Sequence, residues 1–335
     1  MILNVKTNRK QNKISKHAWL PSLLLCVLAL IQLFMAFAPI YPKDEIRIKY
    51  DIKNYGRIFF GIITVPNSTR RSLPWDIWMK KINDEGYHKA VFLSPAQKDY
   101  PNFYLEPPPY YARFLNTNHT WLEDRDRGIK RVVGAKYFVE KTNFDWYWSL
   151  TDDVTVDIEE TQKYIAELEN TFKPRHEIVL KGHCICAHRP IRIYLQGGVG
   201  YLFGRYAAEF FNERGDNWID SMTKWDDGHL QTLLFWMKLT MRSISSHRFY
   251  GVDAEVLTNK KKFEICPEKV GKTKCGYNQL YPFKDIIAIH SNSKTNLTAV
   301  DKKMYELKKH QNMYYYFKDP YQITPCRKIA AEKNN

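Results

Sequence analysis

Short apolar runs and amphipathic segments alternate along most of this chain after residue 57. Three runs rich in β-branched and aromatic residues predict buried strands, at 58–65, 90–93 and 144–150. Three segments with apolar side chains at helical spacing predict helices, at 73–82, 129–138 and 164–172. The last helix should end before Pro174, because a residue preceding proline disfavours the helical conformation. Strands that alternate with helices are typical of an α/β domain with a largely parallel sheet.

The N-terminal region has a different pattern. Residues 18–42 carry no charged side chain, and this run is long enough to cross a bilayer, which takes about 20 apolar residues. We predict a basic cytoplasmic leader at 1–17, a transmembrane signal-anchor at 18–42 and a stem at 43–57, with the remaining chain in the lumen or outside. A cleaved signal peptide is the alternative, but its apolar core would span only about 7–15 residues.

The predicted topology explains part of the net positive charge of the chain. The chain has 335 residues, with 51 Lys and Arg against 36 Asp and Glu, which gives a net charge of +15. Five of the basic residues lie in the leader, where they orient the anchor, so the rest of the chain carries +10. Glycosylation sequons at Asn67, Asn118 and Asn296 agree with a luminal location. We therefore predict no nucleic-acid partner, although a basic excess alone would permit one.

The cysteines suggest oxidised pairing. One of the six lies in the predicted span, and the other five would lie in an oxidising compartment. Because five is odd, at least one stays free or pairs between two copies of the chain as a dimer. Cys266 and Cys275 bracket a stretch that predicts a small closed loop. The segment 183–188 (HCICAH) suggests zinc, but its ligands are closer together than is usual, and a strand or loop with disulfide partners is the alternative.

Two carboxylates follow the third predicted strand, in Thr151-Asp152-Asp153. Ligands of parallel α/β sheets bind beyond the carboxyl ends of the strands, and a pair of carboxylates there suits Mg²⁺ or Mn²⁺. The alternative is that Asp152 and Asp153 cap the next helix. The acidic residues of 124–126 have similar spacing, but the neighbouring arginines would neutralise them, so we interpret that segment as the start of a helix.

Two later segments add candidates. In 194–203, three glycines precede an apolar run and a helix, a pattern that fits backbone lying close to a ligand, or simply a tight turn. The pair Asp226-Asp227 precedes a helix whose buried face should hold Leu230, Leu233, Leu234 and Met237. An acidic pair at this position is first of all a helix cap.

In this order, these segments resemble the Fringe-like β1,3-glycosyltransferases of the inverting family 31, which includes the core 1 galactosyltransferase. The resemblance covers about 58–290 and rests on the following segments: the strand and helix of 58–78 with Thr64, Arg70, Arg71 and Trp78, then 145–153 (DWYWSLTDD), 196–201 (QGGVGY), 225–227 (WDD) and 288–291 (AIHS). It implies a single GT-A-like domain at 58–300, with a Rossmann-like, mostly parallel sheet flanked by helices. The basic aromatic extension at 301–335 lies outside the resemblance, and we interpret it as a helix packed on the domain followed by a frayed end.

The resemblance also implies a reaction. It implies a metal-dependent inverting transfer of a hexose or N-acetylhexosamine from a UDP-sugar to a hydroxyl of a glycan or glycoprotein acceptor, in β1,3 linkage, at the Golgi or endoplasmic-reticulum membrane. Asp153 and His290 would bind Mn²⁺ or another divalent cation, and Asp227 would be the general base. Donor-binding residues would be Asp152, Asp153, Thr64, Arg70, Gly197 and Gly198.

One residue departs from the family pattern. Thr151 stands where the family usually has the first of three aspartates. The change removes a charge near the predicted donor. It motivates an alternative function, in which the chain is a non-catalytic luminal chaperone or binding partner of another transferase.

Overall fold

The computed structural model describes residues 56–65, 68–94, 98–100, 102–106, 122–188, 191–222, 226–251, 265–267, 280–291, 297–309 and 313–316. The chain divides into two units, residues 1–49 and 50–335, and all the described residues belong to the second. The predicted leader, membrane span, sequon asparagines and Cys275 lie outside them. Within the described ranges, no helix combines the length and the apolar character that crossing a membrane requires.

A six-stranded sheet forms the centre of the second unit, in the order β3-β2-β1-β4-β9-β6. Its strands are β1 (Ile58–Ile63), β2 (Lys89–Leu93), β3 (Tyr104–Leu105), β4 (Trp146–Thr151), β6 (Leu180–Gly182) and β9 (Tyr201–Gly204). The strands β3, β2, β1 and β4 are parallel, and β9 is antiparallel to both β4 and β6. All but β9 therefore run in one direction, which confirms the predicted mixed, mostly parallel sheet.

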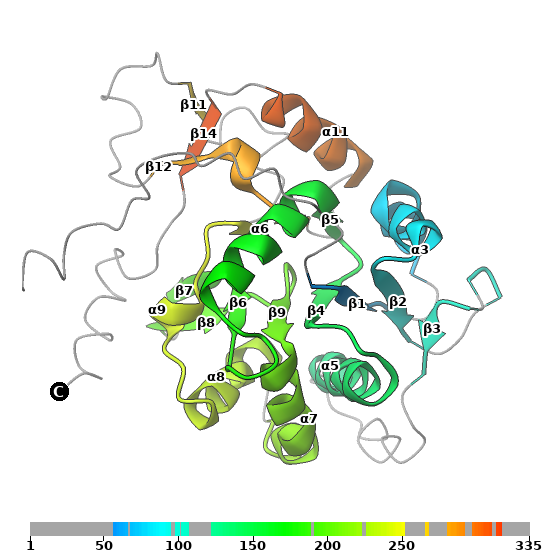
Figure 1. Ribbon diagram of the computed structural model, residues 1–335, viewed down its shortest axis with the longest axis vertical. Helices are drawn as coiled ribbons and strands as arrows, with labels where there is room; N and C mark the ends of the chain where they lie inside the picture. Colours follow the sequence, from blue (N-terminus) through cyan, green and yellow to red (C-terminus); the bar gives the residue numbers. More distant parts are fainter. Residues whose placement is uncertain are drawn as a thin grey trace, which may run out of the picture. The chain divides into compact units, whose positions relative to one another are not determined.

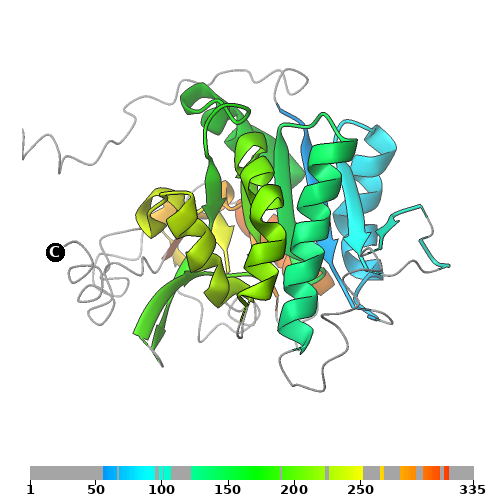
Figure 2. The same ribbon diagram turned by 90° about the horizontal axis from the view of Figure 1, so that it is seen from below.

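Helices cover both faces of this sheet (Figure 1, Figure 2). On one face lie α5 (Leu122–Lys141), α7 (Arg205–Asp220) and α8 (Asp226–Trp236). On the other lie α2 (Ser72–Pro74), η2 (Trp75–Met79), α3 (Lys80–Glu85) and α6 (Ile158–Thr171). Alternate side chains of β1 serve the two cores, because successive residues of a strand point to opposite faces: Phe59 packs in the first core and Phe60 in the second.

A second, three-stranded sheet brings the late part of the chain to the end of β4. It has the order β10-β13-β5 and comprises β5 (Val154–Val156), β10 (Phe249–Tyr250) and β13 (Ala288–His290). The strands β13 and β5 are antiparallel, with His290 opposite Val154. A residue almost 140 positions later in the sequence therefore lies beside the acidic segment that follows β4.

The C-terminal region packs on the rest of the domain. The helix α11 (Leu297–Lys308) spans the predicted boundary at residue 300 and buries Val300, Met304 and Leu307 in a small core. The strand β14 (Met313–Tyr316) lies between β11 (Ile265–Pro267) and β12 (Leu280–Pro282), and η4 (Phe283–Asp285) follows β12. These apolar side chains and strand partners show that the described residues of 301–316 pack on the domain, whereas the boundary at residue 300 stays a prediction.

Other sequence predictions are refined. The strand β3 is an addition to the predicted strands, and α5 is longer than predicted at both ends. Most of the 183–188 segment forms β7 (Cys184–His188), which pairs with β8 (Ile191–Leu195) as a hairpin, so the strand interpretation is confirmed. The short helix α9 (Met241–Ile244) completes the described elements.

His88 makes stability depend on pH. It is buried before β2, and its Nδ1 accepts a hydrogen bond from the Ile58 N–H (3.0 Å). Burial, assisted by the nearby Arg57 charge, lowers the pKa of His88 from 6.5 to about 4. Between pH 6.5 and 4, the unfolded chain therefore binds a proton on His88 that the native state does not bind. The free energy of unfolding keeps the contribution of neutral His88, about 3 kcal/mol, above pH 6.5 and loses it as the pH falls toward 4.

Urea denaturation at pH 7.5 and pH 4.5 should show this loss of unfolding free energy. His88→Asn keeps an acceptor for the Ile58 N–H and cannot titrate, so its pH dependence should be shallower than that of the wild type by about the same amount. Equal slopes in the two proteins would contradict the assignment.

Candidate active site

The residues predicted to form the site lie at the carboxyl edge of the sheet, at the ends of the neighbouring strands β1 and β4. From β1 the chain proceeds to β2 and β3 on one side, whereas β4 pairs with the other side of β1. Open α/β sheets bind ligands at such a topological switch point, beyond the carboxyl ends of the strands. The residues after β1 and after β4 flank this point.

Asp152 connects these two strand ends. Its side chain is buried, and its Oδ2 accepts hydrogen bonds from Thr64 Oγ1 (2.5 Å) and Ser68 Oγ (2.9 Å). Burial raises the pKa of Asp152 above its usual value, although the two hydroxyl donors oppose that shift. Asp152 and Thr64, both predicted to bind the donor, thus lie together, and Ser68 is a partner that the sequence does not predict.

Asp153 is surrounded by donors from three parts of the chain. Arg70 Nη1 lies 3.2 Å from its Oδ2, and Thr151 Oγ1 donates to its Oδ1 at 2.5 Å. His290 Nε2 lies 3.4 Å from the same Oδ1. Burial alone would raise the pKa of Asp153, but the hydrogen bond from His290, together with the Thr151 hydroxyl and Arg70, lowers it. The carboxylate is therefore strongly favoured in its ionised form.

The glycine segment lies against this group. Thr151 N–H donates to Gly198 O at 3.1 Å. A Cβ at Gly198 would overlap the imidazole of His290, and one at Gly200, whose φ is +89°, would overlap the Ser149 carbonyl. Both positions favour glycine for these reasons. The positive φ at Gly200 supports the turn interpretation, and the approach of this backbone to a ligand stays a prediction.

A cavity of about 220 Å³ opens beside Asp153. It is lined by Thr151, Asp153, Gln196, Gly197, Gly198 and His290, together with Arg127 and Arg131 of α5. Asp153 is the one carboxylate in this lining, against two guanidinium groups. The cavity therefore favours a ligand with negative charge.

The basic residues of α5 were missed by the sequence analysis. The helix runs back from the carboxyl edge of the sheet, so its first turns lie at the site. Arg131 is buried, and its guanidinium donates to Ser149 O (3.3 Å), Ser149 Oγ (3.0 Å) and Gly197 O (2.9 Å). Lys130 is also buried and donates to Thr64 O (2.8 Å) and to Asp126. These two cations tie β1, β4 and the glycine segment together.

A spacing signal for these residues exists in the sequence. Arg127 and Arg131 are four positions apart, on one side of a helix that also carries the buried Ile129, Val132 and Val133. Cations at helical spacing beside such buried apolar side chains are candidates for ligand contact. The segment was instead interpreted only as a helix start.

The alternative interpretation of the acidic pair as a helix cap is wrong. The N-cap of α6 is Asp157, whose side chain accepts from the Glu160 N–H at 3.0 Å. Asp152 and Asp153 precede β5 and make the contacts described above. They are therefore available to the site rather than to the helix.

Asp227 lies in the first turn of α8, which begins at Asp226, and Leu230, Leu233, Leu234 and Met237 are buried as predicted. Met222, close before α8, packs near Gly128, the neighbour of the cavity residue Arg127. The start of α8 thus follows a segment at the same edge of the sheet. The catalytic role of Asp227 stays a prediction.

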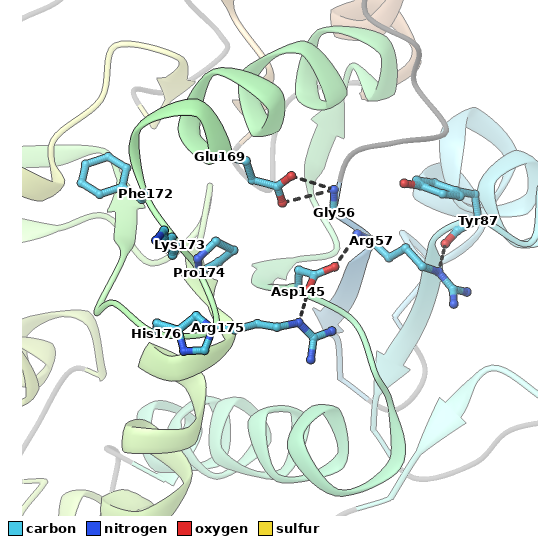
Figure 3. A pocket seen from close by; sticks show the side chains of 10 residues that line it. All are labelled: Gly56, Arg57, Tyr87, Asp145, Glu169, Phe172, Lys173, Pro174, Arg175 and His176. Atoms are coloured by element: carbon cyan, nitrogen blue, oxygen red, sulfur yellow. Dashed lines mark hydrogen bonds and ion pairs between the residues drawn. The ribbon is translucent and has the colours of Figure 1, made fainter.

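A larger cavity of about 510 Å³ lies at the opposite, amino edge of β1 and β4 (Figure 3). Its two acids have structural partners: Glu169 accepts from the Gly56 N–H and the Trp146 indole, and Asp145 accepts from Arg57 N–H and Arg175. These bonds fasten the chain where it enters β1. We assign no chemistry to this cavity.

Gly198→Ala should uncouple His290 from Asp153. The added methyl group must displace the imidazole, while the backbone conformation of Gly198 suits alanine. We expect nucleotide affinity to fall about tenfold, equivalent to about 1.4 kcal/mol, with cooperative unfolding retained.

Isothermal titration with UDP measures this effect. Gly86→Ala is the matched control, because its Cβ would meet nothing within 4 Å and its φ of +70° costs only about 1 kcal/mol of stability. Unchanged affinity in Gly198→Ala would contradict the role of this contact.

Comparison with known proteins gives little further information. No protein-family model matches the chain, and no curated protein sequence matches it. A solved glycosyltransferase involved in the glycosylation of the major capsid of PBCV-1 is 11% identical, with a TM-score of 0.40, over 74% of this chain and 98% of that one. The protein A197 from STIV is 12% identical, with a TM-score of 0.26, over 54% and 76% respectively. Neither likeness carries an argument about this chain, and the Fringe-like resemblance stays a prediction.

Proposed function

We propose that this chain is an inverting glycosyltransferase that uses a UDP-sugar donor and a hydroxyl of a glycan or glycoprotein as acceptor. The observation that carries the proposal is the pair of carboxylates at the β1/β4 switch point, one bonded to hydroxyls after β1 and the other paired with Arg70. A switch point with these groups suits a nucleotide, which presents ribose hydroxyls and a diphosphate. The proposal that this nucleotide carries a sugar rests on the sequence resemblance.

The geometry suggests which residues would contact each part of the donor. Asp152, with its Thr64 and Ser68 partners, lies on the β1 side and suits the hydroxyls of a ribose. Arg70 carries a half-exposed cation next to Asp153 and suits the diphosphate. The cavity lined by Arg127, Gly197 and Gly198 adjoins Asp153 and would receive the sugar together with the phosphate attached to it.

The reaction is a single displacement. The acceptor oxygen forms a bond to C1 of the sugar, the bond from C1 to the diphosphate oxygen breaks with its electron pair leaving on UDP, and the acceptor proton passes to a base. We assign the base to Asp227, on the resemblance and on its place in the first turn of α8. Positive groups near the diphosphate stabilise the charge that develops on UDP.

The location and partners follow from the sequence. We propose a single-pass type II protein of the Golgi or endoplasmic-reticulum membrane with this domain in the lumen, supported by the uncharged run at 18–42 and the three sequons. An unpaired cysteine would allow a disulfide-linked dimer. The β1,3 linkage rests on the resemblance alone.

Asp227→Asn should lower kcat by about 10²- to 10⁴-fold, because the variant cannot accept the acceptor proton. Binding of UDP should change less than about twofold. Kinetics with the full-length chain in detergent, together with UDP titration, separate the two effects. If transfer is detected and Asp227→Asn retains it, another residue is the base. If the wild type binds UDP but never transfers, and co-purifies with a second transferase, the non-catalytic alternative is favoured.

A further inference from the structure

Gln196 fixes the hydrogen bonding of His290. The Oε1 of Gln196 accepts from the Val199 N–H at 2.7 Å, and its Nε2 lies 3.2 Å from His290 Nδ1. A backbone N–H can only donate, so the amide oxygen must face Val199 and the amide nitrogen must face His290. Turning the amide would place two donors against each other at Val199.

This orientation selects one tautomer of the imidazole. An amide nitrogen can only donate, so His290 Nδ1 must accept and carries no proton. The neutral ring then holds its proton on Nε2, the nitrogen that lies 3.4 Å from Asp153 Oδ1. A metal ligand needs a free electron pair on that nitrogen. Histidine ligands of metals usually donate their other N–H to a carboxylate or carbonyl, which is the reverse of this arrangement.

The surroundings of Asp153 agree with this assignment. Its two carboxylate oxygens already have Thr151 Oγ1, His290 Nε2 and Arg70 Nη1 as hydrogen-bond donors. Thr151, the residue that departs from the resembled pattern, therefore supplies a donor to Asp153 where an aspartate would add a second negative charge. The His290 tautomer and the Thr151 hydroxyl both fit an Asp153 whose charge is balanced by protein donors, and neither fits Mn²⁺ bound by Asp153 and His290.

We propose that His290 donates a hydrogen bond to Asp153 instead of binding a metal, and that Arg70 supplies the positive charge facing the donor diphosphate. The second half of this inference rests on the proposed function, whereas the first half concerns the resting protein alone. Gln196 is a positioning residue that acts through His290.

The tautomer can be measured directly. In the full-length chain labelled with ¹⁵N-histidine, with His290→Gln used to assign the signals, we expect an unprotonated Nδ1 and a protonated Nε2 for His290. Gln196→Glu should add a proton to Nδ1 while Nε2 keeps its own, because one carboxylate oxygen still accepts from the Val199 N–H, the other accepts a hydrogen bond from Nδ1, and Asp153 still accepts from Nε2. The matched control is Gln162→Glu, since Gln162 lies 2.9 Å from a different histidine, His88. It should leave the His290 signals unchanged.

A wild-type His290 with an unprotonated Nε2, or a Gln196→Glu variant whose Nδ1 stays unprotonated, would overturn the inference. The electron paramagnetic resonance signal of free Mn²⁺, which decreases when a protein binds the ion, provides a second readout. Without UDP, which itself binds Mn²⁺, the wild type should leave this signal unchanged, whereas Mn²⁺ binding that disappears in His290→Gln would also overturn the inference. Neither readout requires transfer, so failure here is distinct from failure of the proposed function.

Discussion

Replacing Arg131 by methionine is expected to lower the free energy of unfolding by about 3 kcal/mol or more. The guanidinium is buried and donates to the carbonyls of Ser149 and Gly197, so its removal leaves both acceptors without this donor, at about 1–3 kcal/mol each. It also lies over the Tyr201 ring, 4.4 Å from the centroid, and that contact is lost as well. Urea denaturation at pH 7.5 measures the change.

Arg127→Met is the matched control, because Arg127 lines the same cavity but is only half-buried. It should unfold within about 1 kcal/mol of the wild type, as is usual for less buried substitutions. An Arg131→Met protein as stable as the Arg127→Met protein would show that α5 does not hold the glycine segment in place.

Replacing Asp153 by asparagine is expected to lower kcat/KM for glycosyl transfer by about 10³-fold. The amide has no charge to hold Arg70 and offers a donor where His290 and Thr151 also donate, so the positions of all three side chains change. Asp145→Asn is the control. Asp145 also pairs with an arginine, Arg175 at 2.6 Å, but at the opposite edge of the sheet.

Steady-state kinetics of the two variants test this point. Asp145→Asn should lose some stability and keep transfer within about threefold of the wild type, since surface ion pairs contribute at most about 1 kcal/mol. Equal losses of activity in the two variants would indicate a general effect of removing an acid rather than a site at the carboxyl edge.

The local pattern of the sequence predicted the parts of this fold that depend on local side-chain periodicity. The strand from Ile58 and the strand that ends at Thr151 are continuous apolar runs because both faces are buried, and such runs are visible without a structure. The helix α6 was visible from its apolar spacing. Its cap was not, since three aspartates precede it and only backbone geometry selects Asp157.

The candidate site was predicted in part. Thr64, Arg70, Asp152, Asp153, Gly198 and His290 do lie together, although their roles in binding stay predictions. The residues that were missed act across the fold. Lys130 and Arg131 reach the site because α5 packs on β1 and β4, and Gln196 matters through the orientation of one amide. Neither the direction of a helix in space nor the direction of an amide can be obtained from residue spacing.

Release of UDP from a panel of UDP-sugars, with and without Mn²⁺, tests the central claim most directly. The full-length chain is assayed in detergent with an acceptor glycan mixture, beside Asp153→Asn and Asp145→Asn. The account predicts release from at least one donor by the wild type and by Asp145→Asn, and its loss in Asp153→Asn. Absence of both UDP release and UDP binding in the wild type, or release that Asp153→Asn leaves unchanged, would contradict it.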